Sequence, residues 1–258
     1  MTEARWGPVC VRRTPWDGDV FGVSTAEYRV EGAPSAAEVE AGLIGAVKSG
    51  QYDLLYGRLL PTTEVSRALL LTGFYACETQ LVYSLSERSR RLSALDATSG
   101  CTVSLATADD ADAVLAAAHG LFRFSRFHED PLIPVDLAEA RMRAWVRDLA
   151  VRQVTLLVAR SSKGQLIGFM FCTIGRVAEL TLGGCTPEAS FLAPKFWKAL
   201  VDFLFSLGAR SITAAVSAAN VPMMRVYGDL GFNVLRTAFD YHWHRPGSPL
   251  VAIERPRI

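Results

Sequence analysis

The chain has 258 residues, of which half are hydrophobic and about a fifth are charged, and its formal net charge is +1. This composition is typical of a globular protein with a sizeable core, and it excludes an intrinsically disordered chain. The near-neutral charge gives no general attraction to nucleic acids or anionic membranes.

The cysteine pattern and the apolar runs bear on localisation. Five scattered cysteines without CxxC spacing are typical of reduced thiols in a cytosol. The first seven residues carry charge and no apolar stretch, so no secretory signal is expected. The apolar runs are shorter than a bilayer requires. We therefore expect a soluble cytoplasmic protein with no membrane partner.

The first part of the chain shows patterned segments followed by a polar stretch. Residues 85–100 are polar, charged and Ser-rich, as in a linker. We therefore expect two domains, residues 1–96 and residues 97–258. Before the linker, the pattern predicts a strand within residues 47–60, a helix over 64–71 that stops at Gly73, and a strand over 74–85.

After the linker, helices and strands alternate in a mixed order. Pro131 and Pro134 make residues 123–134 a loop. The three consecutive strands predict an antiparallel meander, and hence an α+β fold with a mixed, mostly antiparallel central sheet flanked by helices. The predicted strands cover residues 102–107, 154–160, 166–174, 177–185, 211–217 and 232–244, and the predicted helices cover 108–122, 135–151, 194–207 and 222–230.

Four residues near the C-terminus have a characteristic spacing: Asn220, Tyr227, Gly231 and Phe232. Asn220 is a good helix N-cap, and Gly231 allows the positive φ with which a helix ends abruptly. This segment resembles the closing motif of the Gcn5-related N-acetyltransferase (GNAT) superfamily. The resemblance implies that Tyr227 protonates the departing thiolate and that Asn220 contacts the pantetheine arm. The alternative is that Tyr227 is an ordinary tyrosine at the edge of the core.

The segment AELTLGGC, residues 178–185, resembles the fourth strand of the GNAT fold, which parts from the fifth to admit an acyl-pantetheine. By that resemblance Glu179 takes the place of a general base, provided that burial raises its pKa. The alternative is a solvated glutamate. Gly183, Gly184 and Cys185 are the expected donor-binding positions, because glycines permit close approach of a ligand.

The next segment departs from the GNAT pattern. The family has a glycine-rich loop that closes backbone N–H groups on a pyrophosphate, whereas residues 188–200 contain no glycine. Pro194 removes one donor, and Phe196 and Trp197 are bulky. Lys195 and Lys198 are the candidates to replace those donors by charge. Acetyl-CoA or another acyl-CoA is the expected co-substrate, with its usual phosphate cradle absent or rebuilt.

A second resemblance covers most of the chain. Residues 15–30, 123–134 and 143–146 resemble the nucleotide-sugar amine acetyltransferases that act on dTDP-fucosamine. It implies a smaller, partial GNAT-like N-terminal domain before the catalytic one. The acceptor pocket would then use the loop residues Arg123, Arg126, His128 and Glu129, for which a plain polar surface loop is the alternative.

His242 and His244 occupy alternate positions of the last strand, but no third ligand has suitable spacing for zinc. We expect surface histidines and no metal.

The leading hypothesis is an N-acyltransferase that moves an acyl group from a thioester, most simply acyl-CoA, to the amine of a small molecule such as an amino sugar or natural-product intermediate. One alternative keeps the fold and uses aminoacyl-tRNA as the donor, with tRNA as the acyl carrier, since that donor does not need the pyrophosphate loop. Another is a catalytically silent GNAT-like binding module. A homodimer is left open.

Overall fold

The computed structural model describes residues 3–60, 62–89 and 100–250. The predicted domain boundary between residues 96 and 97 lies outside the described residues. The chain divides into two compact units, each assembled from separate stretches. Unit 1 comprises Met1–Gln80, Phe124–Arg141 and Thr237–Ile258, and unit 2 comprises Leu81–Arg123 and Met142–Arg236.

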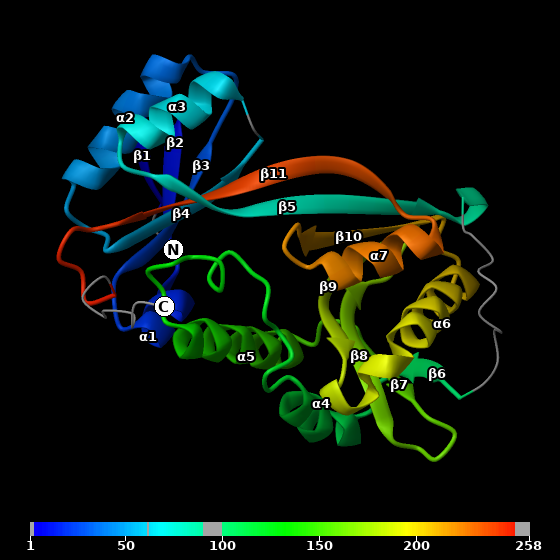
Figure 1. The fold of residues 1–258 in the computed structure, drawn as a ribbon. Coiled ribbons are helices and arrows are strands. Elements are labelled where there is room, and N and C mark those ends of the chain that lie inside the picture. Colours follow the sequence, from blue (N-terminus) through cyan, green and yellow to red (C-terminus); the bar gives the residue numbers. More distant parts are fainter. Residues whose placement is uncertain (1–2, 61, 90–99, 251–258) are drawn as a thin grey trace. The chain divides into compact units, whose positions relative to one another are not determined.

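Unit 1 is a sheet with the strand order β1-β2-β3-β4-β11-β5 (Figure 1). The β3–β4 pair is parallel, and the pairs β1–β2, β2–β3 and β4–β11 are antiparallel. The elements before residue 47 were not predicted from the sequence. The elements of unit 1 are β1 (Glu3–Trp6), β2 (Val9–Arg13), α1 (Pro15–Phe21), β3 (Thr25–Val30), α2 (Ala36–Lys48), β4 (Leu54–Leu59) and α3 (Thr63–Leu71), with parts of β5 (Tyr75–Ser86), α5 (Val135–Val151) and β11 (Asn233–His244).

Helices α2 and α3 bury one face of the unit 1 sheet. Helix α2 begins with a capping box between Ser35 and Glu38. Its Gly45 lets the helix approach the ring of Trp6, because a Cβ there would lie 2.5 Å from that ring. The apolar core between helices and sheet includes Val11, Tyr28, Leu43, Leu55, Phe74 and Trp243. The opposite face carries a second apolar cluster together with many polar side chains.

Unit 2 has the strand order β11-β5-β10-β9-β8-β7-β6, in which β6 to β9 are antiparallel and β9–β10 is parallel. Three elements coincide with the predicted bounds: α5, β9 and β10. The helix predicted over 108–122 is shorter, because Gly120 adopts φ +67° in the turn that follows it. Unit 2 contains β6 (Thr102–Leu105), a 3-10 turn (Ala108–Asp110), α4 (Ala111–Ala117), most of α5, β7 (Leu156–Arg160), β8 (Leu166–Thr173), β9 (Val177–Cys185), α6 (Ala193–Ser206), β10 (Ser211–Ser217) and α7 (Val221–Leu230).

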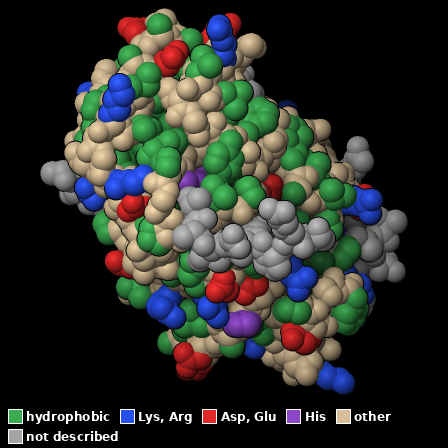
Figure 2. Space-filling model, turned by 60° about the vertical axis from the view of Figure 1, so that its left-hand side comes forward, with side chains coloured by type: hydrophobic (Ala, Val, Ile, Leu, Met, Phe, Trp, Pro, Cys, Tyr) green, Lys and Arg blue, Asp and Glu red, His purple; other side chains and the backbone are tan. Residues whose placement is uncertain are grey.

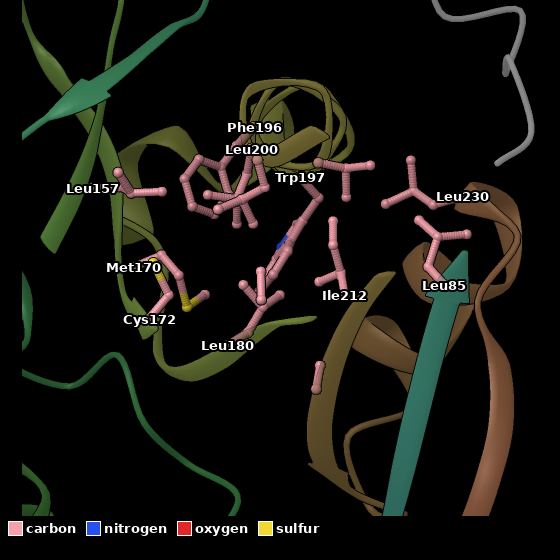
Figure 3. Packing of buried hydrophobic residues seen from close by; sticks show 14 of the residues in the cluster. Leu85, Leu157, Met170, Cys172, Leu180, Phe196, Trp197, Leu200, Ile212 and Leu230 are labelled. Carbon is pink, nitrogen blue, oxygen red and sulfur yellow. The ribbon is translucent and has the colours of Figure 1, made fainter. Parts of the chain in front are cut away.

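Both faces of the unit 2 sheet are covered by helices. On one face, Trp197 of α6 points toward Leu180 of β9 and Ile212 of β10 (Figure 3). On the other, Val146 of α5 packs with Phe169 of β8. The α+β expectation is confirmed. Among the described residues, none of the helices is both long and apolar enough to cross a membrane.

Candidate functional site

Strands β9 and β10 of unit 2 part from each other halfway along β9. Their parallel pairing joins residues 177–180 to residues 211–214 and ends there, although β9 continues to Cys185. On its other side β9 has an irregularity, since Phe171 of β8 faces Leu182 and the next residue, Cys172, faces Leu180. Thr181 is therefore an extra residue in β9. Backbone groups beyond Leu180 are released from pairing with β10, which makes them available to an extended ligand.

Helix α7, which follows β10, has the termini that the sequence predicted. The Asn220 side chain accepts a hydrogen bond from the Met223 N–H over 3.2 Å. At the other end Gly231 has φ 91°, so that the chain turns sharply into Phe232 and β11. The N-cap and the left-handed C-terminal residue are both confirmed.

Tyr227 lies in the core of unit 2, with 3% of its surface exposed. Its ring centroid lies 4.7 Å from that of Phe232, 5.2 Å from that of Tyr83 and 5.5 Å from that of Trp197. Burial, and to a smaller extent the neighbouring Tyr83, raises the pKa of Tyr227 above its ordinary value. The phenol therefore keeps its proton at neutral pH, as a proton donor must.

The predicted donor-binding positions of β9 have different surroundings. Glu179 is exposed to solvent. A Cβ on Gly183 would lie 2.1 Å from the Phe169 carbonyl oxygen, so strand pairing with β8 already requires this glycine. One on Gly184 would touch the Leu121 side chain at 3.6 Å. Burial raises the pKa of the Cys185 thiol to about 12, which makes it a neutral thiol.

The segment in place of a glycine-rich loop forms a 3-10 turn, Pro187–Leu192, followed directly by α6. Pro194 lies in the first turn, and Phe196 and Trp197 are buried in the core (Figure 3). Lys195 is half-buried in the same turn. The Lys198 Nζ is 2.7 Å from Asp202 Oδ2, and 12% of the lysine side chain is exposed. Lys198 is thus held by an ion pair on its own helix.

The predicted acceptor residues fall in both units. Arg123 is exposed in unit 2, whereas Arg126, His128 and Glu129 belong to unit 1. The Arg126 guanidinium lies 4.4 Å from the centroid of the Tyr56 ring. His128 Nδ1 is 2.8 Å from the Ser125 hydroxyl, and burial lowers the pKa of His128. Glu129 is half-buried.

A buried cluster around Asp130 was missed by sequence reasoning. The expectation that His242 and His244 lie on the surface is wrong: both are buried. His242 Nδ1 and His244 Nε2 lie 2.7 and 2.8 Å from Asp130 Oδ2. The Tyr75 hydroxyl and the Leu132 N–H each donate to Asp130 Oδ1 over 2.8 Å. The two histidines share one side of β11, and the 124–141 segment of unit 1 buries that side.

The protonation states in this cluster follow from its contacts. Burial raises the pKa of Asp130, but the hydrogen bonds from His242 and His244 outweigh it and hold that pKa well below its usual range. The carboxylate of Asp130 is therefore ionised. Burial lowers the pKa of His242, so this imidazole is neutral. Asp130 Oδ2 is therefore the acceptor for both rings.

Cys77, Asp130 and His242 also lie close enough to be considered together as metal ligands, with ligand atoms within 4.8 Å of one another. The outer nitrogens, Nε2 of His242 and Nδ1 of His244, have no hydrogen-bond partner among the described residues. A metal-bound imidazole usually donates its outer N–H to an acceptor. The contacts that the two rings do make are those of a hydrogen-bonded network around Asp130.

A second missed cluster surrounds Glu78. Arg58 contacts Asp240 over 2.8 Å and Glu78 over 3.4 Å, and Arg126 contacts Asp240 over 3.2 Å. Burial and the nearby Asp240 raise the pKa of Glu78 to about 8, against the opposing effect of Arg58. The sequence contained one indication of these clusters: polar residues at alternate positions of β11, namely Asp240, His242 and His244. A strand with one side facing solvent shows the same alternation, so the pattern alone did not reveal that this side is buried.

The N-terminal segment 15–30 contributes to the same face of unit 1. The Tyr56 hydroxyl donates to Asp17, and Arg141 Nε donates to Asp17 Oδ1 over 2.8 Å. The buried Asp17 thus joins α1 to the start of α5.

No family model matches the sequence, and no curated protein sequence matches it. Solved structures match at low identity. A GCN5-related N-acetyltransferase from Kribbella flavida has 16% identity and a TM-score of 0.59, with 95% of this chain and 90% of that chain covered. A conserved protein of unknown function from Staphylococcus epidermidis has 12% identity and a TM-score of 0.63, with 95% of this chain and 94% of that chain covered. A tandem GNAT protein from the clavulanic acid biosynthesis pathway has 14% identity and a TM-score of 0.58, covering 87% and 78%.

At these identities the likeness concerns the fold. The predicted GNAT architecture is confirmed, because the matches extend over most of the chain and the parted strands and α7 motif are present. The chain has the α+β fold of the GNAT proteins.

Proposed function

We propose that the protein is an N-acyltransferase that moves an acyl group from a thioester to the amine of a small molecule. The observation that carries the proposal is the parting of β9 and β10 beyond Leu180, beside an extra residue in β9. Unpaired main-chain groups there can hydrogen-bond an extended pantetheine arm and polarise a thioester carbonyl. The nucleophile is then the neutral amine of the acceptor. Its nitrogen bonds to the carbonyl carbon as the carbon–sulfur bond breaks.

Tyr227 is the proposed proton donor to the departing thiolate. Its phenol carries a proton at neutral pH and can give it to the sulfur as the carbon–sulfur bond breaks. Its aromatic neighbours fix the ring, so that little rotational freedom is lost in the reaction.

We propose that the proton of the acceptor amine passes to a water molecule, with Glu179 as its further acceptor. Glu179 lies on β9, in the same unit as Tyr227 and the parted strands. Because Glu179 is exposed, water has access to its carboxylate.

The first test is turnover of acetyl-CoA and longer acyl-CoAs with a panel of amines that includes amino sugars and sugar nucleotides bearing an amine. Tyr227→Phe should lower kcat about a hundredfold, the typical contribution of a positioned acid. Tyr83→Phe removes a neighbouring phenol from the same cluster and should leave kcat nearly unchanged. Absence of turnover by the parent protein with every pair would contradict the proposal and favour a silent binding module.

A second test concerns the proton acceptor. Glu179→Gln should lower kcat about a hundredfold, the typical contribution of a positioned base. Glu188→Gln, at another exposed glutamate of unit 2, is the matched control and should leave kcat nearly unchanged. An unchanged kcat in Glu179→Gln would contradict a role for this carboxylate.

One observation favours an aminoacyl-tRNA donor instead. The first turn of α6 contains Pro194 and two core aromatic residues where a pyrophosphate loop would need free backbone donors. Against it, the face seen in Figure 2 shows basic and acidic side chains interspersed rather than a continuous basic surface. Loss of activity on ribonuclease treatment would identify the tRNA donor, and full activity after that treatment would exclude it.

A further inference from the structure

Two exposed apolar residues of unit 2 follow the carboxyl ends of the parted strands. Phe191, in the 3-10 turn after β9, has 78% of its surface exposed, and Val221, the first residue of α7 after β10, has 45% exposed. Because β9 and β10 are parallel, their carboxyl ends lie at the same edge of the sheet. An extended donor that enters between the strands from that edge therefore meets an apolar rim, formed by Phe191 and Val221.

The turn that carries Phe191 is anchored to the core of unit 2. Ala189 is buried in the main apolar cluster of the unit, and the Thr186 N–H donates to the Ile167 carbonyl oxygen of β8 over 2.8 Å. The phenyl ring therefore projects into solvent from a fixed backbone. Aromatic side chains of this kind are enriched at protein interfaces, because they bury a large area while few torsions lose freedom.

The same segment lacks what the phosphates of a nucleotide donor require. Pro194 has no N–H, and the Ala193 N–H already donates to the Ser190 carbonyl oxygen of the preceding 3-10 turn. These first-turn groups of α6 are the ones that a helix N-terminus would otherwise offer to an anion. Because the nucleotide half of coenzyme A carries a diphosphate and a further phosphate, this segment gives it little to bind.

We propose that the acyl donor is the phosphopantetheine arm of a carrier protein, whose surface around the arm packs on the apolar rim. The inference rests on the proposed acyl transfer and names its donor. Such an arm uses the same unpaired main-chain groups of β9, and its one phosphate stays beside the carrier. The carbon–sulfur bond breaks as the acyl group moves to the amine, and the arm leaves as a free thiol on the carrier. Contact with the rim takes the place of the phosphate contacts of coenzyme A.

The character of the rim also argues against a tRNA donor. Proteins hold nucleic acids by many lysine and arginine contacts to phosphates. Here the exposed residues next to the parted strands are apolar, and a single cation follows each of them by four positions: Lys195 after Phe191 and Arg225 after Val221. A carrier protein requires only a small apolar contact around its arm, as in other transient interfaces.

Three kinds of acetyl donor that share the arm test the proposal by isothermal titration calorimetry: acetyl-pantetheine, acetyl-CoA and a panel of acetylated acyl carrier proteins. The Kd of acetyl-CoA should lie within about threefold of that of acetyl-pantetheine, because the phosphates gain few contacts. At least one carrier protein should bind about tenfold more tightly than acetyl-pantetheine, since the ring of Phe191 becomes buried in the interface.

A pair of variants tests the rim itself. Phe191→Ala should weaken binding of that carrier protein about tenfold and leave the Kd of acetyl-pantetheine unchanged. Val151→Ala, at another exposed apolar residue of unit 2, is the matched control and should change neither Kd. Equal Kd values for the carrier protein in Phe191→Ala and Val151→Ala would exclude the rim as the contact.

Either of two further results would overturn the proposal: acetyl-CoA that binds at least tenfold more tightly than acetyl-pantetheine, or a panel in which no carrier protein binds more tightly than acetyl-pantetheine. These measurements involve no turnover. Failure of the proposed acyl transfer is therefore a separate result, in which donors bind but no acetyl group reaches any amine.

Discussion

Asp130 and His242 are hydrogen-bonded across 2.7 Å with both side chains fully buried, and they join the 124–141 segment of unit 1 to strand β11. The buried carboxylate accepts hydrogen bonds from His242, His244 and Tyr75, and an amide in its place leaves at least one of these donors without an acceptor. Asp130→Asn should therefore lower the free energy of unfolding by about 3 kcal/mol in urea denaturation. The exposed Asp19→Asn, also in unit 1, should change it by less than about 0.5 kcal/mol. Equal effects of the two substitutions would show that the pair adds nothing to stability.

Glu78 should make stability depend on pH. Its pKa is about 8 in the folded protein and near 4.5 when unfolded, so between these values the folded state binds more protons. Stability therefore falls as pH rises through this window, by up to about 1.4 kcal/mol per pH unit. Because glutamine does not ionise, the unfolding free energy of Glu78→Gln relative to the parent should increase from pH 5 to pH 8. A difference that stays constant with pH would contradict this, and the exposed Glu179→Gln serves as the control.

Two glycines of the α7 region should respond oppositely to alanine. Gly231 has φ 91°, where alanine costs about 1–2 kcal/mol. Gly228 lies within the helix with open space around it, and alanine there should stabilise by up to about 1 kcal/mol. Thermal unfolding of Gly231→Ala and Gly228→Ala measures both. A stabilising Gly231→Ala would mean that the helix does not end in the left-handed conformation.

Substitution of Lys198 tests whether a positive charge binds the donor's phosphates in place of the backbone N–H groups of a glycine-rich loop. A lysine that binds the donor's phosphates should raise the KM for acyl-CoA at least tenfold when it is removed, since charge-assisted hydrogen bonds are strong. Its ion pair with Asp202 predicts instead that Lys198→Ala changes this KM less than about threefold. Lys163→Ala, in the exposed turn between β7 and β8, is the matched control. A tenfold rise confined to Lys198→Ala would establish the phosphate contact.

The sequence alone determined much of unit 2. Apolar periodicity gave the bounds of α5, β9 and β10, because burial on one or two faces imposes a regular pattern. Asn220 and Gly231 gave the ends of α7, since helix termini have local chemical requirements. The lack of glycine in residues 188–200 likewise excluded the usual loop.

Only the tertiary structure decided the environments of the charged groups. Periodicity places His242 and His244 on one side of a strand but does not say what covers that side, and the covering segment comes from residues more than a hundred positions away. For the same reason Glu78 is a buried carboxyl with a raised pKa, whereas Glu179, in the expected strand, is exposed. Desolvation and charge partners set acid–base behaviour, and both are properties of the folded chain.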